Sequence, residues 1–140
     1  MRTSVLSLFA VVLVLALAAT ACGKENGTEE DGGTITIAGQ KANDHGMKDV
    51  SGESSVELEQ DNFYFEPTVL EGTPGQKLTI ELSNEGSALH NFSIPDQSID
   101  QDVQPDAKGE VTVTFPDSGT LVFFCKYHQS QGMVGALEAS

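Results

Sequence analysis

The chain reads Gly119-Thr-Leu-Val-Phe-Phe-Cys-Lys-Tyr-His-Gln-Ser-Gln-Gly-Met-Val-Gly-Ala-Leu137 near its C-terminus. The run that ends at Cys125 is rich in β-branched and aromatic residues, which predicts a buried strand. A short loop follows over residues 126–132, and a second apolar run begins at Met133. Two neighbouring strands joined by a short loop can aim the side chains of Cys125, His128 and Met133 into one pocket.

A fourth candidate, His90, lies in the segment Ser87-Ala-Leu-His-Asn-Phe-Ser-Ile-Pro95. One thiolate, two imidazoles and one thioether form the ligand set of a blue-copper site, which has three strong ligands and a weak axial thioether. This set satisfies neither Cu(I) nor Cu(II) completely, so little has to move when an electron arrives or leaves. The four residues therefore indicate a copper site suited to electron transfer, and His90 ties that site to the rest of the sheet.

Each residue taken alone has a simpler interpretation. His90 could be a core histidine, Met133 could fill a gap in the core, and Cys125 could be an inert buried thiol. A catalytic Cys–His pair needs an exposed thiol, a base and a third orienting group, whereas Cys125 ends a hydrophobic strand. A binuclear copper centre needs a second Cys in the loop. Zinc would bind the thiolate and the imidazoles, but Met is a poor zinc ligand. The combination favours one copper ion in a protein that is not an enzyme.

The region from about Val56 to Ser140 resembles the plastocyanin-type cupredoxins, which carry His-Asn upstream and Cys-x2-His-x4-Met downstream. Three further stretches match this family: Asp61–Pro67, Gly72–Leu78 and Val111–Phe115. The resemblance implies one type 1 copper ion with these ligands: His90, Cys125, His128 and Met133.

The resemblance also implies roles for residues around the metal. Asn91 would brace the loop that carries Cys125. Many family members have Ser or Thr after the Cys to pair with this Asn, whereas here Lys126 follows, so the bracing would run through the backbone. The ring edge of His128 would approach solvent through an apolar patch where a redox partner docks, and His90 would be more buried.

The folded part is expected to be one small domain over residues 56–140, an all-β, antiparallel Greek-key sandwich or barrel of the cupredoxin type. No segment has a convincing helical period, and Pro-, Gly- and Asn-containing turns separate short apolar runs. We expect a loop over Asp96–Gly109, which has few apolar residues. The predicted strands are Val56–Gln60, Asn62–Phe65, Lys77–Ser83, His90–Ile94, Val111–Phe115, Thr120–Cys125 and Val134–Glu138.

Residues 1–21 are typical of a signal peptide, with Arg2 before a short apolar run. Small residues lead directly into Cys22 and resemble a bacterial lipobox, in which this Cys is lipidated and becomes the mature N-terminus. Cleavage without lipidation and a Cys22–Cys125 disulfide are the alternatives. Lipidation would hold the protein on the outer face of a bacterial membrane.

Residues 22–55 are acidic, rich in Gly and poor in large apolar residues, which predicts a flexible tether of about 30 Å root-mean-square length. Thr34–Ile37 alternates like a short strand that could join a sheet edge. In the tether, His45 and Met47 could bind copper weakly, although Asn, Asp and Gly around them are equally typical of a solvated turn.

The formal net charge is −14, and it becomes −15 without the signal peptide. No basic cluster is present to neutralise phosphates, which excludes nucleic-acid binding. An acidic monomeric carrier suits partners with a basic docking face, such as c-type cytochromes or a respiratory or photosynthetic complex. The alternative is that the acidity only keeps an exported protein soluble. The alternative function is copper delivery, storage or sensing. Carriers of that kind usually expose Met-rich or His-rich tracts, and only Met47 and Met133 follow the signal peptide.

Overall fold

The computed structural model describes residues 32–140, which form strands and two short 3₁₀ helices, η1 (Pro95–Gln97) and η2 (Gln129–Gln131). This part of the chain has no helix long and apolar enough to cross a bilayer. The predicted all-β fold is confirmed. The strands are β1 (Thr34–Ile37), β2 (Gln40–Asn43), β3 (Met47–Asp49), β4 (Ser55–Asp61), β5 (Tyr64–Glu66), β6 (Val69–Gly72), β7 (Lys77–Asn84), β8 (His90–Ile94), β9 (Ile99–Val103), β10 (Lys108–Thr114), β11 (Gly119–Phe124) and β12 (Val134–Ala139).

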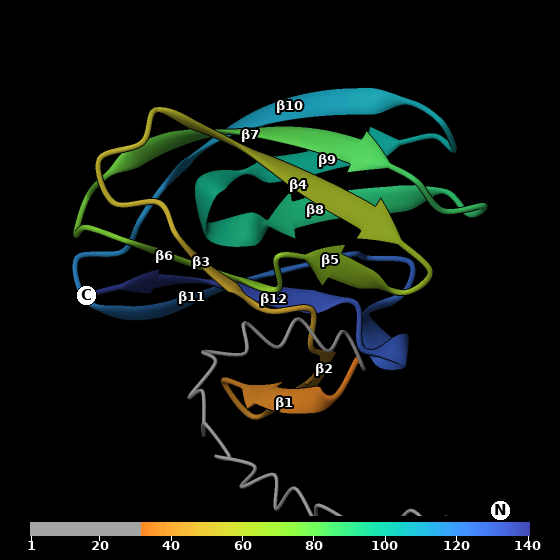
Figure 1. Ribbon diagram of the computed structural model, residues 1–140, viewed down its shortest axis with the longest axis horizontal. Coiled ribbons are helices and arrows are strands. Elements are labelled where there is room, and N and C mark those ends of the chain that lie inside the picture. The colour runs from red at the N-terminus through yellow and green to blue at the C-terminus, as the bar shows by residue number, and fades with distance from the viewer. Residues whose placement is uncertain (1–31) are drawn as a thin grey trace, which may run out of the picture.

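Two sheets face each other in a sandwich, one in the order β10-β7-β4-β5 and the other in the order β3-β6-β12-β11-β8-β9 (Figure 1). Alternate residues of β4 point inward, which places Val56, Leu58 and Gln60 in the interior. At the centre, the ring of Phe123 lies 5.0 Å from that of Phe65 and 4.8 Å from that of Phe92, measured between centroids. These aromatic rings fix the spacing of the sheets at the end where β8 begins and β11 ends.

The sheets are mixed, since three strand pairs are parallel and the others antiparallel. The parallel pairs are β4–β7, β6–β12 and β3–β6. The pair β4–β7 is parallel because the chain leaves their sheet after β5, forms β6 in the other sheet and returns at β7. His90, at the start of β8, lies at the same end of the sandwich as the loop between β11 and β12, because β8 pairs antiparallel with β11 at Ser93 and Phe124.

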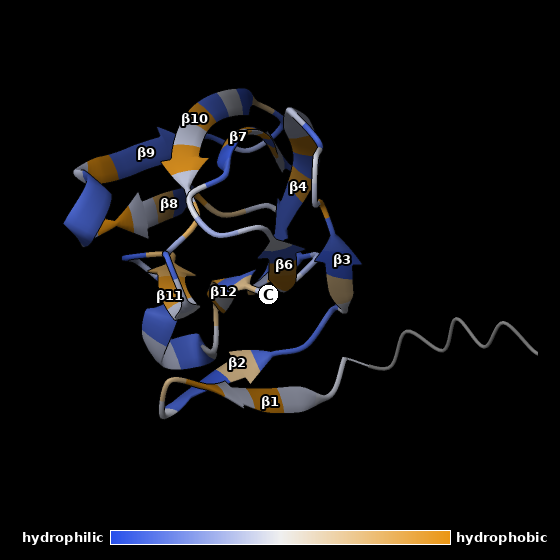
Figure 2. Ribbon diagram, turned by 90° about the vertical axis from the view of Figure 1, so that its left-hand side faces the viewer, coloured by the Kyte–Doolittle hydropathy of each residue, from blue (hydrophilic) through white to orange (hydrophobic). Residues whose placement is uncertain are grey.

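The β1–β2 hairpin lies outside the sandwich, below β12 in Figure 2. Its apolar residues Ile37 and Ala42 are buried against Val69, Val134 and Ala136 of the six-stranded sheet. This sheet is therefore covered on both faces around β12, which explains why the first four residues of that strand are all buried.

The structure corrects the predicted tether in part. The strand expected at Thr34–Ile37 is confirmed, but β2 and β3 are also folded, and β3 pairs with β6 at the edge of the main sheet. These segments are polar, and they are held by backbone pairing and by a few buried residues such as Ala42 and Val50. Residues 22–31 of the predicted tether, which include Cys22, and the signal peptide lie outside the described residues.

The expected loop over Asp96–Gly109 is also wrong in part. Its centre forms β9, an edge strand paired with β8 from His90–Val103 to Ile94–Ile99. Ile99, Gln101 and Val103 turn toward the protein, while the aspartates between them are exposed. The strand has few apolar residues because only one of its two faces is covered. Strand β6, which the sequence analysis missed, carries the buried Val69 and Leu70.

Candidate metal centre

The loop between β11 and β12 is closed by backbone hydrogen bonds that bring its predicted ligands together. The Cys125 N–H donates to the carbonyl of Met133 at 3.0 Å, and the His128 N–H donates to the carbonyl of Cys125 at 3.1 Å. Gly132 ends η2 with a φ of 92°, a left-handed conformation that favours glycine. The chain therefore reverses within a few residues and returns to Met133 beside Cys125.

Three of the predicted ligands gather at this end of the sandwich. One donor atom from each of His90, Cys125 and His128 lies within 4.8 Å of the other two. The two imidazole centroids are 5.3 Å apart. His90 and Cys125 are fully buried and His128 is half-buried, as the resemblance implied.

His90 provides the test of whether these residues fit a metal. Its ring is inaccessible to solvent, and neither Nδ1 nor Nε2 has a hydrogen-bond partner. Buried ring nitrogens are normally paired, so an imidazole with two free nitrogens beside a thiol and a second imidazole fits a bound metal. Burial, together with the neighbouring His128, lowers the pKa of His90 to about 4. The ring is therefore neutral at pH 7 and able to act as a ligand.

This lowered pKa makes the stability of the metal-free protein depend on pH. The pKa of His90 is about 4 in the folded protein against 6.5 without the fold. The unfolded chain therefore takes up the proton first as the pH falls, and stability decreases through this range. We expect the free energy of unfolding to fall by about 2 kcal/mol between pH 7 and pH 5.

Urea unfolding of the metal-free protein at both pH values measures this loss. The His90→Gln variant provides the control, because it has no titrating group at this position and should lose most of the dependence. An equal loss in both proteins would assign the effect to other groups.

The surroundings of the Cys125 sulfur favour a thiolate bound to a metal cation. Burial raises its pKa, while backbone N–H groups of Tyr127, His128 and Asn91 point to the sulfur and lower it. These three donors stabilise the thiolate once a metal cation replaces the proton. Metal binding should therefore release a proton and weaken in acid.

His128 forms the outer side of the site. Its Nδ1 lies 2.9 Å from Oε1 of Gln131, and its Nε2 lies 3.2 Å from the carbonyl of Leu89. The ring of Phe63 covers it, with 4.4 Å between centroids. The half-exposed imidazole beside an aromatic ring is where the resemblance places the docking patch.

Met133 is fully buried in the same core cluster as Cys125, and its backbone N–H donates to the carbonyl of His128 at 3.2 Å. Its role as the axial ligand stays a prediction. The second predicted metal region is different: His45 stacks on Tyr64 with 3.4 Å between ring centroids, and Met47 is exposed. His45 does not join the ligand group.

Asn91 contacts the Cys125 loop through the backbone of Lys126. This is the contact expected from a Lys where many family members have Ser or Thr. The Asn91 Oδ1 accepts the Lys126 N–H at 3.3 Å. Its Nδ2 donates to Asp100 at 2.7 Å and to Asp102 at 2.8 Å. The Lys126 ammonium also binds both carboxylates, at 2.6 Å and 3.1 Å. The two aspartates of β9 therefore connect Asn91 to the ligand loop, a role that the sequence analysis missed.

Gly86 is a second residue that the sequence analysis missed. A Cβ at this position would lie 2.8 Å from Nε2 of His90 and 2.7 Å from Oδ1 of Asn62. The backbone at Gly86 therefore supports the His90 ring from the Nε2 side. We expect Gly86→Ala to displace the buried ring and to weaken copper binding by about 10–100-fold.

Competition with a copper chelator measures this loss of affinity. Asn62→Ala is the matched control, because it removes the other neighbour of Gly86 and leaves His90 in place. Equal affinities for the Gly86→Ala protein and the unchanged protein would show that Gly86 does not position His90.

The chain belongs to the family of cupredoxin-like domains, whose model matches residues 8–136. No curated protein matches it significantly. Among solved structures it is similar to auracyanin A, a blue copper protein of Chloroflexus aurantiacus, with 20% identity, a TM-score of 0.51 and coverage of 61% of this chain and 98% of that one. It is also similar to the metal binding domain of the Cu(I)-exporting ATPase of Streptococcus pneumoniae, with 11% identity, a TM-score of 0.53 and coverage of 66% and 96%.

A third similar structure is a heme-copper terminal oxidase, with 17% identity, a TM-score of 0.53 and coverage of 64% of this chain and 66% of that one. At these identities the likeness shows the fold. The site itself, with a buried thiol, two imidazoles and a buried Met at the end of the ligand loop, fits one type 1 copper ion.

Proposed function

We propose that this protein is a membrane-anchored mononuclear type 1 copper protein that carries single electrons between redox partners. The observation that carries this proposal is the buried His90 ring, whose nitrogens are both unpaired and one of which lies within 4.8 Å of a donor atom of Cys125 and of His128. The bound copper would supply the Cu(I)/Cu(II) couple. His90, Cys125 and His128 would hold it, and Met133 would add a weak thioether ligand.

The residues around the copper favour a closed redox site. His90 and Cys125 are buried, and Asn91 fixes the loop that follows Cys125, so the ligands are held in nearly the same positions for both oxidation states. His128 is the one half-exposed ligand, and it provides the path for an electron to reach the surface. When its ring binds copper, one of its contacts with Gln131 and Leu89 must give way.

The partner in this proposal presents a basic docking face. Burial raises the pKa of Glu59 in β4, and the surrounding carboxylates raise it further: Glu66, Glu85, Glu57 and Asp61. A basic patch on the partner would relieve this repulsion and accelerate encounter. The anchor in the proposal is a lipid on Cys22, which would hold the protein on the outer face of a bacterial membrane.

Electron transfer to a basic c-type cytochrome should be strongly salt-dependent. We expect the second-order rate constant to fall about tenfold between 10 mM and 300 mM ionic strength, because salt screens the attraction. Stopped-flow mixing of the reduced protein with the oxidised cytochrome measures it. The Glu59→Gln/Glu66→Gln variant should be slower and less salt-dependent, whereas Asp117→Asn, at the opposite end of the sandwich, should not. Equal salt dependence in all three proteins would reject this docking surface.

Copper transfer to a metal-free acceptor distinguishes this function from copper delivery. An electron carrier should keep its copper over many cycles of reduction and oxidation. Rapid transfer of Cu(I) to the acceptor, together with slow electron exchange with the cytochrome, would favour the delivery, storage or sensing function.

A further inference from the structure

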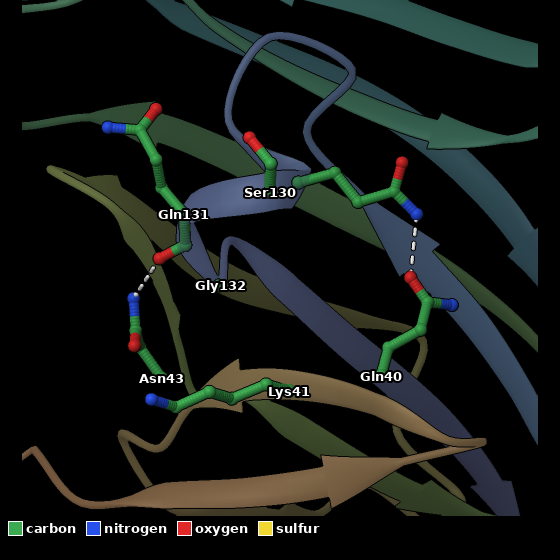
Figure 3. A pocket seen from close by; sticks show the side chains of 7 residues that line it. Gln40, Lys41, Asn43, Ser130, Gln131 and Gly132 are labelled. Carbon is green, nitrogen blue, oxygen red and sulfur yellow. Dashed lines mark hydrogen bonds between the residues drawn. The ribbon is translucent and has the colours of Figure 1, made fainter.

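The hairpin β1–β2 meets the ligand loop at Asn43, the last residue of β2. The Asn43 Nδ2 donates to the carbonyl of Gln131 at 2.9 Å, the bond drawn in Figure 3, and to the carbonyl of Phe63 at 2.8 Å. The Asn43 backbone N–H donates to the carbonyl of Gly132 at 2.9 Å. One residue therefore binds two separate segments that border the copper site.

Both segments contact the half-exposed ligand. Gln131 and Gly132 belong to the loop that carries His128, and the Oε1 of Gln131 lies 2.9 Å from the Nδ1 of His128. Phe63 packs against the same ring, at 4.4 Å between centroids. Asn43 holds the backbone of both segments that contact the imidazole, although it does not touch the imidazole itself.

The hairpin and the ligand loop approach each other closely, but only a few residues make the contact. A Cβ on Gly132 would lie 2.8 Å from the Oδ1 of Asn43, so the loop backbone rests directly on the Asn43 side chain. A second bond joins Gln129 Nε2 to Gln40 Oε1 at 2.6 Å. A groove of about 480 Å³ lies between this bond and the hydrogen bond from Asn43 to Gln131 (Figure 3). At this point the loop is held by a few hydrogen bonds and not by packed apolar side chains.

We propose that the β1–β2 hairpin is a latch on the ligand loop and that Asn43 is the positioning residue of this latch. The latch keeps the loop closed on His128, so that bound copper leaves slowly. The inference rests on the proposed function, because it takes His128 as a copper ligand. It assigns a role in copper retention to a segment whose composition is typical of a tether.

Copper release from the full chain tests the latch. The copper-loaded protein is mixed with excess EDTA, and loss of the visible band is followed in the unchanged protein, Asn43→Ala, Asn43→Asp and Lys41→Ala. Asn43→Ala loses the two side-chain hydrogen bonds and should release copper about tenfold faster than the unchanged protein. Asn43→Asp should match Asn43→Ala, because the carboxylate keeps the shape but donates no hydrogen bond to the two carbonyls. Lys41 lines the same groove without holding the loop, so Lys41→Ala should release copper at the rate of the unchanged protein.

Amide hydrogen exchange in the metal-free proteins separates a latch from a general loss of stability. In Asn43→Ala, exchange should accelerate at the amides of residues 131–133, while β7 and β8 keep their protection. Unchanged release and unchanged exchange at residues 131–133 would overturn the inference, and so would faster exchange throughout both sheets. If the unchanged protein bound no copper, the proposed function would fail, and hydrogen exchange alone would still test the latch.

Discussion

We expect the Cys125→Ser protein loaded with Cu(II) to lack the intense thiolate-to-copper absorption band and to be nearly colourless. The band requires sulfur bonded to Cu(II), and Cys125 is the one cysteine of residues 32–140. Serine should preserve the fold, because its hydroxyl can accept from the backbone N–H groups of Tyr127, His128 and Asn91 that now point to the sulfur. His90 and His128 would remain and could still hold Cu(II) weakly.

Visible absorption of both proteins with one equivalent of Cu(II) makes this comparison. His45→Gln is the control, since His45 stacks on Tyr64 away from the ligand group and its replacement should leave the band unchanged. If Cys125→Ser kept an intense band, the thiolate would not be a ligand, and the type 1 assignment would be wrong.

Gly135→Ala should destabilise the protein by about 3 kcal/mol, because the new methyl group has no space. Gly135 pairs with Phe123 across β11 and β12, and a Cβ would overlap the Phe123 ring. It would also lie 2.6 Å from the backbone carbonyl oxygen of Thr68. The Phe123 ring cannot turn away, since it is fully buried against Phe65 and Phe92.

Urea unfolding of the metal-free protein measures this effect without involving copper. Gly109→Ala is the matched control on β10, where the nearest atom, Cγ2 of Val103, lies 3.2 Å from the new methyl group and belongs to a side chain. That variant should lose less than about 1 kcal/mol. Similar stabilities for the two variants would mean that the Phe123–Gly135 contact does not limit the core.

The parts of the fold and site that the sequence predicted are those with a strong local pattern. His90–Ile94 matches β8 residue for residue, and Pro95 marks the end of this strand in the sequence as in the structure. Cys125 and His128 come together because they lie on one short loop between two apolar strands. His90 is distant in the chain, and its place in the site followed from the resemblance to a family.

The parts that the sequence did not predict depend on contacts between distant polar segments. Asp100 and Asp102 lie on an edge strand whose exposed face is acidic, so its composition resembles that of a loop. Asn43 is in a polar stretch, and its partners are 20 and 88 residues away along the chain. Gly86 matters only because the His90 ring rests against it. None of these contacts leaves a periodic pattern in the sequence.

The visible absorption spectrum of the purified protein after addition of one equivalent of Cu(II) tests the central claim most directly. The four-ligand site predicts an intense blue or green band that bleaches with a mild reductant and returns on reoxidation. A protein that binds copper but stays nearly colourless would contradict the type 1 site, because Cys125 would then not be bonded to Cu(II).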